Sequence, residues 1–487
     1  MALKEELTGI LDTEDILDGP ETLEAYSRDF SFARPVRPRM VIRPRSMDQV
    51  QSIVGLANEQ GVPLVTVSSG PPRFHGDTVP GVEGAVVVDL SGMKRIVDID
   101  RRNRIAVIEA GVTYTELQPE LARHGLRLTM PLAPRSNKSV IASLLEREPT
   151  VIPRQIWTAV DPLRSTWIIW GDGKLLRTGD AGNAPSIEEA RKRKQAMTGA
   201  GGPGQTDFYR FVSAAQGSMG IVPQASVKCE VLPQPHRLFL VPARKLEDLL
   251  DFTYRVLKFR FADELFILNG VELAYLLGED IKSIGALKEK LPAWMVVLGI
   301  AGRNMLPEER VAFQEKDIAG FAGQCGLEMV PEVPGAGNEE VMKAVLSPSR
   351  EPYWKLTWKG NYQDILFINT LDRMPGFVEI MESAAGAGGY PEGDIGVYLQ
   401  PLHQGSSCHC EFTLPFNGDD GEETAGMEKL LADASRKLMD RGAFFSRPYG
   451  IWADMAYSRD PQSARVLKGL KGIFDPNKVL NPGKLCF

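Results

Sequence analysis

The sequence is poor in cysteine. Its five cysteines, Cys229, Cys325, Cys408, Cys410 and Cys486, form an odd set without any Cys-x-x-Cys pair. Iron–sulfur clusters and zinc ribbons are usually held by cysteines at that spacing, so we expect neither within this chain. A sparse set of thiols is typical of a protein from a reducing compartment, and we therefore expect a cytoplasmic location.

Long apolar runs and an excess of positive charge are also lacking. No apolar stretch reaches 18 residues, so a transmembrane helix is not expected. The first seven residues predict an acidic amphipathic helix and have neither the charged nor the apolar region of a signal peptide. The net charge of −7 argues against a nucleic-acid partner, because phosphate-binding proteins usually carry a basic patch.

What is present is an ordinary globular composition, with 43% hydrophobic and 24% charged residues. A chain of 487 residues is long for one hydrophobic core, so we expect two or three packed units. Strands and helices alternate in the first half, which indicates an α/β unit. The expected strands are 39–43, 61–67, 85–90 and 104–109, and the expected helices are 46–58, 113–124 and 207–215.

The pattern changes near Pro233 and Pro235. From there to about residue 440, apolar residues at helical spacing alternate with short β-branched runs, which predicts a separate α+β unit. The expected helices are 246–259, 307–325 and 423–441, and the expected strands are 265–268, 294–300, 365–368, 395–400 and 408–414.

A loop rich in Ser, Gly and Pro follows the strand that we expect at 61–67. A loop with few bulky side chains exposes backbone N–H groups, and successive N–H groups that point into one concavity bind anions. This segment alone fits a surface turn equally well. A second turn lies at Gln216-Gly-Ser-Met-Gly-Ile-Val222, where Gly217 and Gly220 indicate a close approach of the backbone to another group.

Five segments together resemble the vanillyl-alcohol oxidase / p-cresol methylhydroxylase superfamily of flavoproteins. They are residues 39–77 with the following 79–100, Ala110-Gly-Val-Thr-Tyr-Thr-Glu-Leu117, residues 217–222, Ile473-Phe-Asp-Pro-Asn-Lys-Val-Leu-Asn-Pro-Gly-Lys484, and the lead-in at 19–29. They occur in the family's order and at its spacing. The lead-in is most similar to the D-lactate dehydrogenase and glycolate oxidase branch.

The resemblance implies an α+β fold in which a two-part, PCMH-type domain holds FAD beneath a cap domain. The expected division is an FAD-binding domain at 1–235, a cap or substrate domain at 236–440, and a C-terminal segment at 441–487 that returns to the first domain. By position in the family pattern, the residues implied to bind the cofactor are Ser69, Gly70, Arg73, His75, Gly76, Asp77, Gly217, Ser218, Gly220, Ile221, Val222, Asn481 and Lys484.

The sequence departs from the family pattern at two places. The pyrophosphate loop, commonly glycine-rich, contains Pro71 and Pro72, which cannot donate N–H groups, and we expect Arg73 to contact phosphate instead. The stretch after Pro134, commonly small and glycine-rich, carries charges here. Some family members bind FAD covalently through a His of the first loop. His75 lies three residues later, so we expect a non-covalent FAD.

A histidine-containing segment at 400–412 is the first candidate for the chemistry. The hydroxy-acid branch has a His-rich segment here that binds a divalent metal and the substrate hydroxyl, and the match to it is approximate. If 408–414 is a strand, His409 and Glu411 share one face while Cys408 and Cys410 share the other. We expect His403 and His409 to bind substrate or take a proton, with a metal on His403, His409 and Glu411 as an alternative; a purely structural strand is the other interpretation.

Arg447 and Tyr449 are the second candidates, since they lie where the chain is expected to return to the first domain. Arg447 would hold a substrate carboxylate, and Tyr449 would hydrogen-bond the substrate or act as a base. An aromatic corner that only packs the domain interface is the structural alternative.

These features predict an FAD-dependent oxidoreductase, a dehydrogenase that moves a hydride from a hydroxy acid or related alcohol to flavin. The electrons would pass to a separate acceptor, such as an iron–sulfur protein or an electron-transfer flavoprotein, because this chain lacks cluster ligands. A phenolic substrate is the first alternative. A flavin-bearing electron-transfer or scaffold subunit without its own substrate is the second.

Overall fold

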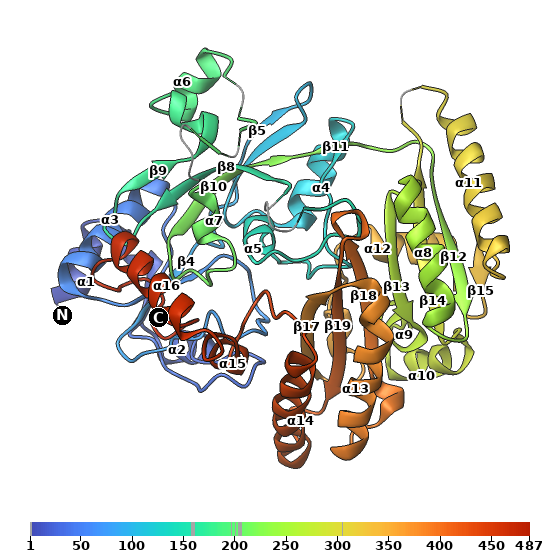
Figure 1. Cartoon of the computed structure of the whole chain (residues 1–487). Helices are drawn as coiled ribbons and strands as arrows, with labels where there is room; N and C mark the ends of the chain where they lie inside the picture. Colours follow the sequence, from blue (N-terminus) through green and yellow to red (C-terminus); the bar gives the residue numbers. More distant parts are fainter. Residues whose placement is uncertain (1, 157–160, 196, 200, 203–206, 304) are drawn as a thin grey trace.

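The computed structural model describes residues 2–156, 161–195, 197–199, 201–202, 207–303 and 305–487 (Figure 1). Helices and sheets are mixed in it, and the expected α+β class is confirmed. Among the described residues, no helix is both long and apolar enough to cross a membrane. Three large sheets organise the chain.

The first sheet is the parallel core of the N-terminal part. Its strands lie in the order β1-β2-β4-β3, and β4 pairs in parallel with both β2 and β3. The strands are β1 Ile16–Leu17, β2 Met40–Ile42, β3 Leu64–Val67 and β4 Val86–Asp89, and the helices around them are α1 Ala2–Thr8, α2 Pro20–Ala25 and α3 Met47–Gln60. Helix α3 begins where expected, because the Ser46 side chain accepts a hydrogen bond from the backbone N–H of Gln49.

The second sheet is antiparallel, in the order β5-β6-β10-β8-β9. Its strands are β5 Ile96–Asp100, β6 Ile105–Glu109, β8 Leu163–Ile169, β9 Leu175–Arg177 and β10 Ile221–Lys228, and its helices are α4 Tyr114–Arg123, α5 Val140–Leu145, α6 Ile187–Lys192 and α7 Tyr209–Val212. The predicted helix at 207–215 is thus wrong except for one turn, since Ser213 is already extended after Val212. Helix α4 has the predicted Thr113 cap, reinforced by Glu116.

The third sheet is six-stranded and antiparallel, in the order β12-β14-β13-β18-β19-β17. Its strands are β12 His236–Ala243, β13 Glu264–Asn269, β14 Trp294–Ala301, β17 Asn361–Asn369, β18 Gly396–Leu402 and β19 Ser407–Phe416. The helices are α8 Glu247–Phe259, α9 Gly270–Leu277, α10 Ile281–Lys290, α11 Pro307–Gln324, α12 Asn338–Val345, α13 Met374–Ala387 and α14 Gly421–Asp440. All strands of this sheet lie within the 236–440 range that we proposed as the second domain.

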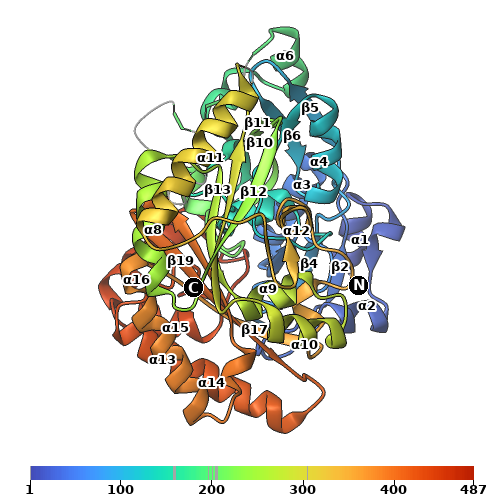
Figure 2. The ribbon, with the colours of Figure 1, turned by 90° about the vertical axis from the view of Figure 1, so that its right-hand side faces the viewer.

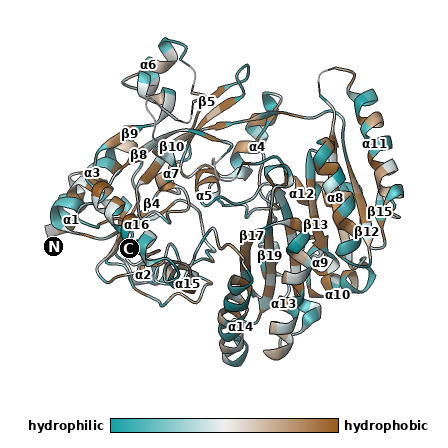
Figure 3. Ribbon diagram, in the orientation of Figure 1, coloured by the Kyte–Doolittle hydropathy of each residue, from teal (hydrophilic) through white to brown (hydrophobic). Residues whose placement is uncertain are grey.

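The two faces of this sheet are covered by different helices. Alternate strand residues pack on one side against α8, α11, α13 and α14, and on the other side against α9, α10 and α12. Figure 2 shows α8 and α11 on one side of β12 and β13, with α9, α10 and α12 on the other. The strands are hydrophobic along most of their length while the outer helix faces are hydrophilic (Figure 3). The sheet is therefore a buried platform that fixes what β17, β18 and β19 present.

The C-terminal segment returns to the first sheet. Helices α15 Ile451–Tyr457 and α16 Pro461–Phe474 follow the six-stranded sheet, and the Lys471 ammonium of α16 donates to the carbonyl oxygen of Ser218, just before β10. Leu480 then bridges to Leu64 of β3 in parallel. The remaining elements are the strand pairs β7 Leu126–Arg127 with β11 Glu230–Val231 and β15 Glu332–Val333 with β16 Ala336–Gly337, and 3₁₀ turns at Thr13–Asp15, Gly179–Asn183, Trp354–Leu356, Leu371–Arg373, Glu392–Asp394 and His403–Gly405.

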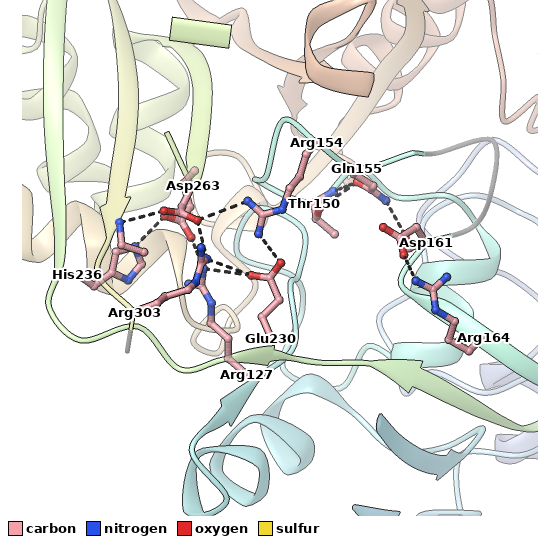
Figure 4. A network of polar contacts seen from close by, with 12 residues as sticks. Arg127, Thr150, Arg154, Gln155, Asp161, Arg164, Glu230, His236, Asp263 and Arg303 are labelled. Atoms are coloured by element: carbon pink, nitrogen blue, oxygen red, sulfur yellow. Dashed lines mark hydrogen bonds and ion pairs between the residues drawn. The ribbon is translucent and has the colours of Figure 1, made fainter. Parts of the chain in front are cut away.

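An ion network joins the N-terminal part to the six-stranded sheet (Figure 4). Arg127 of β7 pairs with Glu264 of β13 at 2.9 Å, and His236 of β12 contacts the other oxygen of Glu264 at 2.7 Å. Glu230, Asp263, Arg154 and Arg303 extend the network at the same junction. Breaking a buried pair leaves an uncompensated charge. The network therefore holds the two parts in one relative position.

Candidate functional site

A cavity lies where the three sheets meet. Its walls come from the end of β3 and the following loop, the segment around α5, the start of β10, the facing strands β17, β18 and β19, and the segment at Arg447. Residues far apart in sequence thus converge on one space. Of the residues predicted to bind cofactor, those that line this cavity are Ser69, Arg73, His75, Asp77, Gly217, Gly220, Ile221 and Val222.

The loop after β3 is held from behind by the segment before α5. The backbone N–H of Gly70 donates to the carbonyl oxygen of Asn137 at 3.1 Å, and the Ser69 hydroxyl accepts from the backbone N–H of Ser139 at 3.0 Å. The Arg135 guanidinium donates to the carbonyl oxygens of Gly70 and Pro72. Side chains thus fix the loop that the two prolines deprive of N–H donors. Gly70 supports the loop without lining the cavity.

Arg73 keeps its predicted position beside the cavity. Its guanidinium lies over the Tyr26 ring, 4.7 Å from the centroid. Gly76 adopts φ +72°, and a Cβ there would lie 2.8 Å from that of Ala33, so only glycine fits. The backbone N–H of Gly76 donates to the Asp29 carboxylate at 2.7 Å, which anchors the loop away from the cavity.

The second turn has the two glycines that its geometry requires. Gly217 adopts φ +69°, and a Cβ on Gly220 would lie 2.9 Å from Ile168 and 3.0 Å from Val212. Ser218 is fully buried and its hydroxyl donates to the carbonyl oxygen of Ala215 at 2.6 Å. Ser218 therefore holds the turn and does not reach the cavity.

The C-terminal residues clamp both cofactor loops. The Asn481 amide donates to the carbonyl oxygens of Asp77, at 2.9 Å, and Gln216, at 2.7 Å. The Lys484 ammonium donates to the carbonyl oxygen of Gly76 at 2.7 Å. Neither residue lines the cavity. Asn481 thus fastens backbone of both loops, and Lys484 fastens backbone of the first.

Arg447 and Tyr449 both line the cavity. They are 4% and 6% exposed, and the Tyr449 ring stacks on His75 with centroids 4.4 Å apart. Burial, together with Lys138 and Arg447, lowers the pKa of His75 to about 3, so its ring is neutral. Burial also raises the pKa of the Tyr449 phenol, which keeps it protonated as a donor.

His409 and Glu411 share the cavity-facing side of β19, as predicted. The His409 ring lies 3.2 Å from Glu411, and Cys408 and Cys410 pack on the opposite face into the helix-covered core. His409 is 2% exposed and lies behind Glu411, which lines the cavity. Burial lowers the pKa of His409, against the effect of Glu411. The pair therefore consists of a neutral imidazole and a carboxylate.

His403 does not join this pair. It lies in the 3₁₀ turn at His403–Gly405 with φ 51°, its backbone N–H donates to the carbonyl oxygen of Gln155 at 3.0 Å, and it does not line the cavity. Across the part of the chain that the structure describes, no three His, Cys, Asp or Glu side chains are grouped to hold a metal ion. The alternative metal set of His403, His409 and Glu411 is not assembled, because the turn carries His403 away from the strand.

Two charged groups in the cavity were missed by sequence reasoning. The Lys355 ammonium lies 2.8 Å from both oxygens of Asp364 and 2.5 Å from Glu411. Lys138 lies 2.7 Å from Glu146 and 3.0 Å from Glu148. The only sequence signal was the charged stretch after Pro134, which the family pattern fills with small residues.

The polar groups of the cavity fit a flavin dinucleotide. The Thr78 hydroxyl and Nη2 of Arg447 are buried, line the cavity and have no hydrogen-bond partner among the described residues. Buried polar groups are nearly always hydrogen-bonded, so two such donors indicate a ligand with acceptor oxygens. The diphosphate and ring carbonyls of FAD are acceptors that suit the Thr78 hydroxyl, and Arg73 and Arg135 place positive charge beside the same loop.

Comparisons with known proteins point to the same cofactor. Residues 38–179 match the family model described as an FAD binding domain. The D-2-hydroxyglutarate dehydrogenase of Stutzerimonas stutzeri is 23% identical, over 99% of this chain and 98% of its own. The D-lactate dehydrogenase of Anaerostipes hadrus is 20% identical, over 97% of this chain and 94% of its own.

Solved structures share the fold. The 4-ethylphenol oxidase of Gulosibacter chungangensis superposes with a TM-score of 0.84 at 17% identity, over 99% of this chain and 96% of its own. The structure of p-cresol methylhydroxylase superposes with a TM-score of 0.82 at 16% identity, again over 99% of this chain and 96% of its own. The matched FAD-binding segment contains the loop and the α5 region that wall the cavity. The chain therefore contains an FAD binding domain and shares its fold with a 4-ethylphenol oxidase and p-cresol methylhydroxylase.

Proposed function

We propose that the chain is a dehydrogenase that oxidises a hydroxy acid at the FAD and delivers the electrons to a separate acceptor. Arg447 carries the proposal. Its guanidinium is buried against the cavity with Nη2 unpartnered among the described residues, and a planar guanidinium matches a carboxylate with two parallel hydrogen bonds. The full-length relatives named as D-2-hydroxyglutarate and D-lactate dehydrogenases support this substrate class.

Each remaining residue then has a role. FAD held in this cavity would supply the electron-accepting ring for a hydride from the substrate carbon. Arg447 holds the carboxylate, and the protonated Tyr449 phenol donates a hydrogen bond to the same substrate. The hydroxyl proton would leave through Glu411, whose carboxylate faces the cavity, to the neutral imidazole of His409. Although burial opposes its ionisation, Lys355 lowers the pKa of Glu411 by its 2.5 Å contact and keeps it ionised.

The cofactor-binding set follows from the cavity walls. Ser69, Arg73, His75, Asp77 and the turn at Gly217 and Gly220 would contact the nucleotide, with Ile221 and Val222 as apolar walls. Gly70, Gly76, Ser218, Asn481 and Lys484 would hold those segments in place. His75 is stacked on Tyr449 and neutral, and we propose that FAD is bound without a covalent link.

A phenol is the second candidate substrate. Tyr353, Trp354, Tyr362 and Tyr398 line the cap side of the cavity, and aromatic walls favour a flat ring. The solved structures of a 4-ethylphenol oxidase and a p-cresol methylhydroxylase share only the fold at this identity. A carrier subunit without its own substrate would not need a buried arginine with an unpartnered nitrogen at the cavity, as Arg447 has. We therefore place that alternative third.

Affinity measurements on Arg447 variants test the substrate class. We expect Arg447→Gln to keep FAD and to weaken binding of a hydroxy acid by at least tenfold, since a charge-assisted bidentate contact is lost. Binding of the matching alcohol without a carboxylate should not change. Arg436→Gln, on the exposed surface of α14, is the matched control. Equal loss for the acid and the alcohol would exclude Arg447 as the carboxylate ligand.

A further inference from the structure

A charged cluster of Lys138, Glu146 and Glu148 lines the cavity between the cofactor loops and the cap. Helix α5 builds it, because Lys138 precedes this short helix and both glutamates follow it. The Lys138 ammonium lies 2.7 Å from Oε2 of Glu146 and 3.0 Å from Oε1 of Glu148. Glu146 and Glu148 belong to the charged stretch that departs from the family pattern, and the proposed mechanism uses none of the three side chains.

Stability does not explain the cluster. The three side chains are only 6%, 18% and 17% exposed, so folding removes three charges from water. Replacing such a buried ion group with apolar residues of similar volume is often neutral or stabilising. The helix itself is already capped by Ser139 and packed through Val140, Ile141 and Leu144. A group that is costly to bury beside a ligand cavity is a candidate for function.

The two glutamates are held differently. Glu148 accepts a hydrogen bond from the Ser143 hydroxyl at 2.6 Å, and although burial opposes ionisation, Lys138 and Ser143 lower its pKa to about 2. Glu146 has no such hydroxyl, and burial, opposed by Lys138, raises its pKa to about 7. One carboxylate is thus fixed as an anion, while the other can exchange a proton near neutral pH.

Glu146 faces groups from every neighbouring segment. His75 approaches it at 4.0 Å from the first loop, and Asp77 of the same loop repels its charge. Tyr449 on the C-terminal segment and Tyr114 on α4 also feel that charge. The neutral His75 and the two protonated phenols add no positive charge, so Lys138 is the one cation that directly pairs with Glu146 among the described residues.

We propose that Glu146 takes up one proton in step with reduction of the bound flavin, with Lys138 and Glu148 as positioning residues. The inference rests on FAD binding in this cavity, though not on the substrate class. Hydride transfer brings two electrons and one proton to the flavin and leaves the cavity one negative charge richer. That charge raises the affinity of Glu146 for a proton, so two protons rather than one are taken up per two electrons.

Potentiometry of the holoprotein tests this without any substrate. The midpoint potential of bound FAD is measured against indicator dyes between pH 6 and 8.5. For a two-electron couple each proton contributes about 30 mV per pH unit. We expect wild type to take up more protons per two electrons than Glu146→Gln, by about half a proton at pH 7, where Glu146 is half-protonated before reduction, and by up to about one proton near pH 8. Glu146→Asp should restore the second proton, and Glu428→Gln on the exposed face of α14 should match wild type.

Two outcomes would overturn the proposal. One is the same proton number for wild type and Glu146→Gln. The other concerns Lys138→Met. Without the Lys138 cation the pKa of Glu146 should rise, so the extra proton uptake should move to higher pH; a proton number with the same pH dependence as in wild type would contradict this. Lys138→Met also serves if Glu146→Gln fails to retain FAD. Failure to find any oxidisable substrate would leave these potentials unaffected, so the two proposals fail separately.

Discussion

The imidazole of His75 stacks on the phenol ring of Tyr449, with centroids 4.4 Å apart and planes 10° apart. The first residue belongs to the loop after β3 and the second to the segment that follows the six-stranded sheet. The Gln216 amide reinforces the contact by donating to the carbonyl oxygen of Pro448 at 3.0 Å. The stack therefore ties the cofactor loop to the segment that carries Arg447.

Loss of this stack should loosen cofactor binding. Aromatic pairs contribute about 0.5 to 1.5 kcal/mol beyond the area that they bury. We expect Tyr449→Ala to weaken FAD affinity by about 2- to 10-fold, and Tyr449→Phe to leave it unchanged, as judged by quenching of flavin fluorescence on titration of the apoprotein. An equal loss in both variants would mean that the hydroxyl, and not the stack, holds this region.

Denaturation should release the cofactor intact. His75 is neutral, buried and stacked on Tyr449, and we propose that it forms no covalent bond to the flavin. We expect the purified protein to be yellow and to lose all its flavin to the supernatant after acid precipitation. Flavin fluorescence that stays on the denatured protein band would contradict the non-covalent proposal.

The ion network at the junction should contribute stability that depends on pH. Burial opposes ionisation of Glu264, but Arg127 and His236 lower its pKa from the ordinary 4.5 to about 2. A carboxyl group with a lowered pKa stabilises the fold above pH 4.5, and this contribution is lost as the pH falls toward 2. Glu264→Gln should therefore cost about 3 to 5 kcal/mol of unfolding free energy at pH 7.

Urea unfolding at pH 7 and pH 3.5 measures this effect. The difference between wild type and Glu264→Gln should shrink at the lower pH. The control is Glu308→Gln, whose partner Arg237 lies on the exposed surface, and it should change the free energy of unfolding by less than about 1 kcal/mol. A difference that is constant between the two pH values would show that the ionised form of Glu264 is not what stabilises the junction.

Substitutions on β19 separate proton transfer from packing. Loss of a general base costs about 10² to 10⁴ in rate. We expect Glu411→Gln and His409→Ala to retain FAD and to slow flavin reduction by substrate by that factor, because the proton would pass through Glu411 to His409. His403→Ala should change the rate little, because His403 lies outside the cavity. Stopped-flow absorbance measures all three, and a slow His403→Ala beside a normal Glu411→Gln would reverse the assignment.

Local patterns predicted most of the helices and strands of the N-terminal part, since those signals lie within short segments. The caps at Ser46 and Thr113, and the opposite faces of Cys408 and His409, follow from spacing alone. The contacts on the six-stranded sheet could not be predicted in this way. Lys355 and Glu411 are 56 residues apart and meet only through the pairing of β17 with β19.

Two local features also escaped prediction. His403 was expected beside His409, but positive φ values at His403 and Gln404 turn the chain before β19 begins. The charged stretch after Pro134 looked like a defect in the flavin site. Only the short helix α5 shows that Lys138 and Glu146 face one another across it. Both outcomes depend on backbone turns that side-chain periodicity does not encode.

Anaerobic titration of the purified flavoprotein tests the central claim most directly. Hydroxy acids, their non-carboxylate alcohols and phenols are added one at a time while the oxidised flavin absorbance is followed. We predict that at least one hydroxy acid bleaches the flavin fully at one equivalent, that its matching alcohol does so only at far higher concentration, and that Arg447→Gln removes this preference. Bleaching by phenols alone, or by no compound in the panel while dithionite reduces the flavin normally, would contradict the proposal of a hydroxy-acid dehydrogenase.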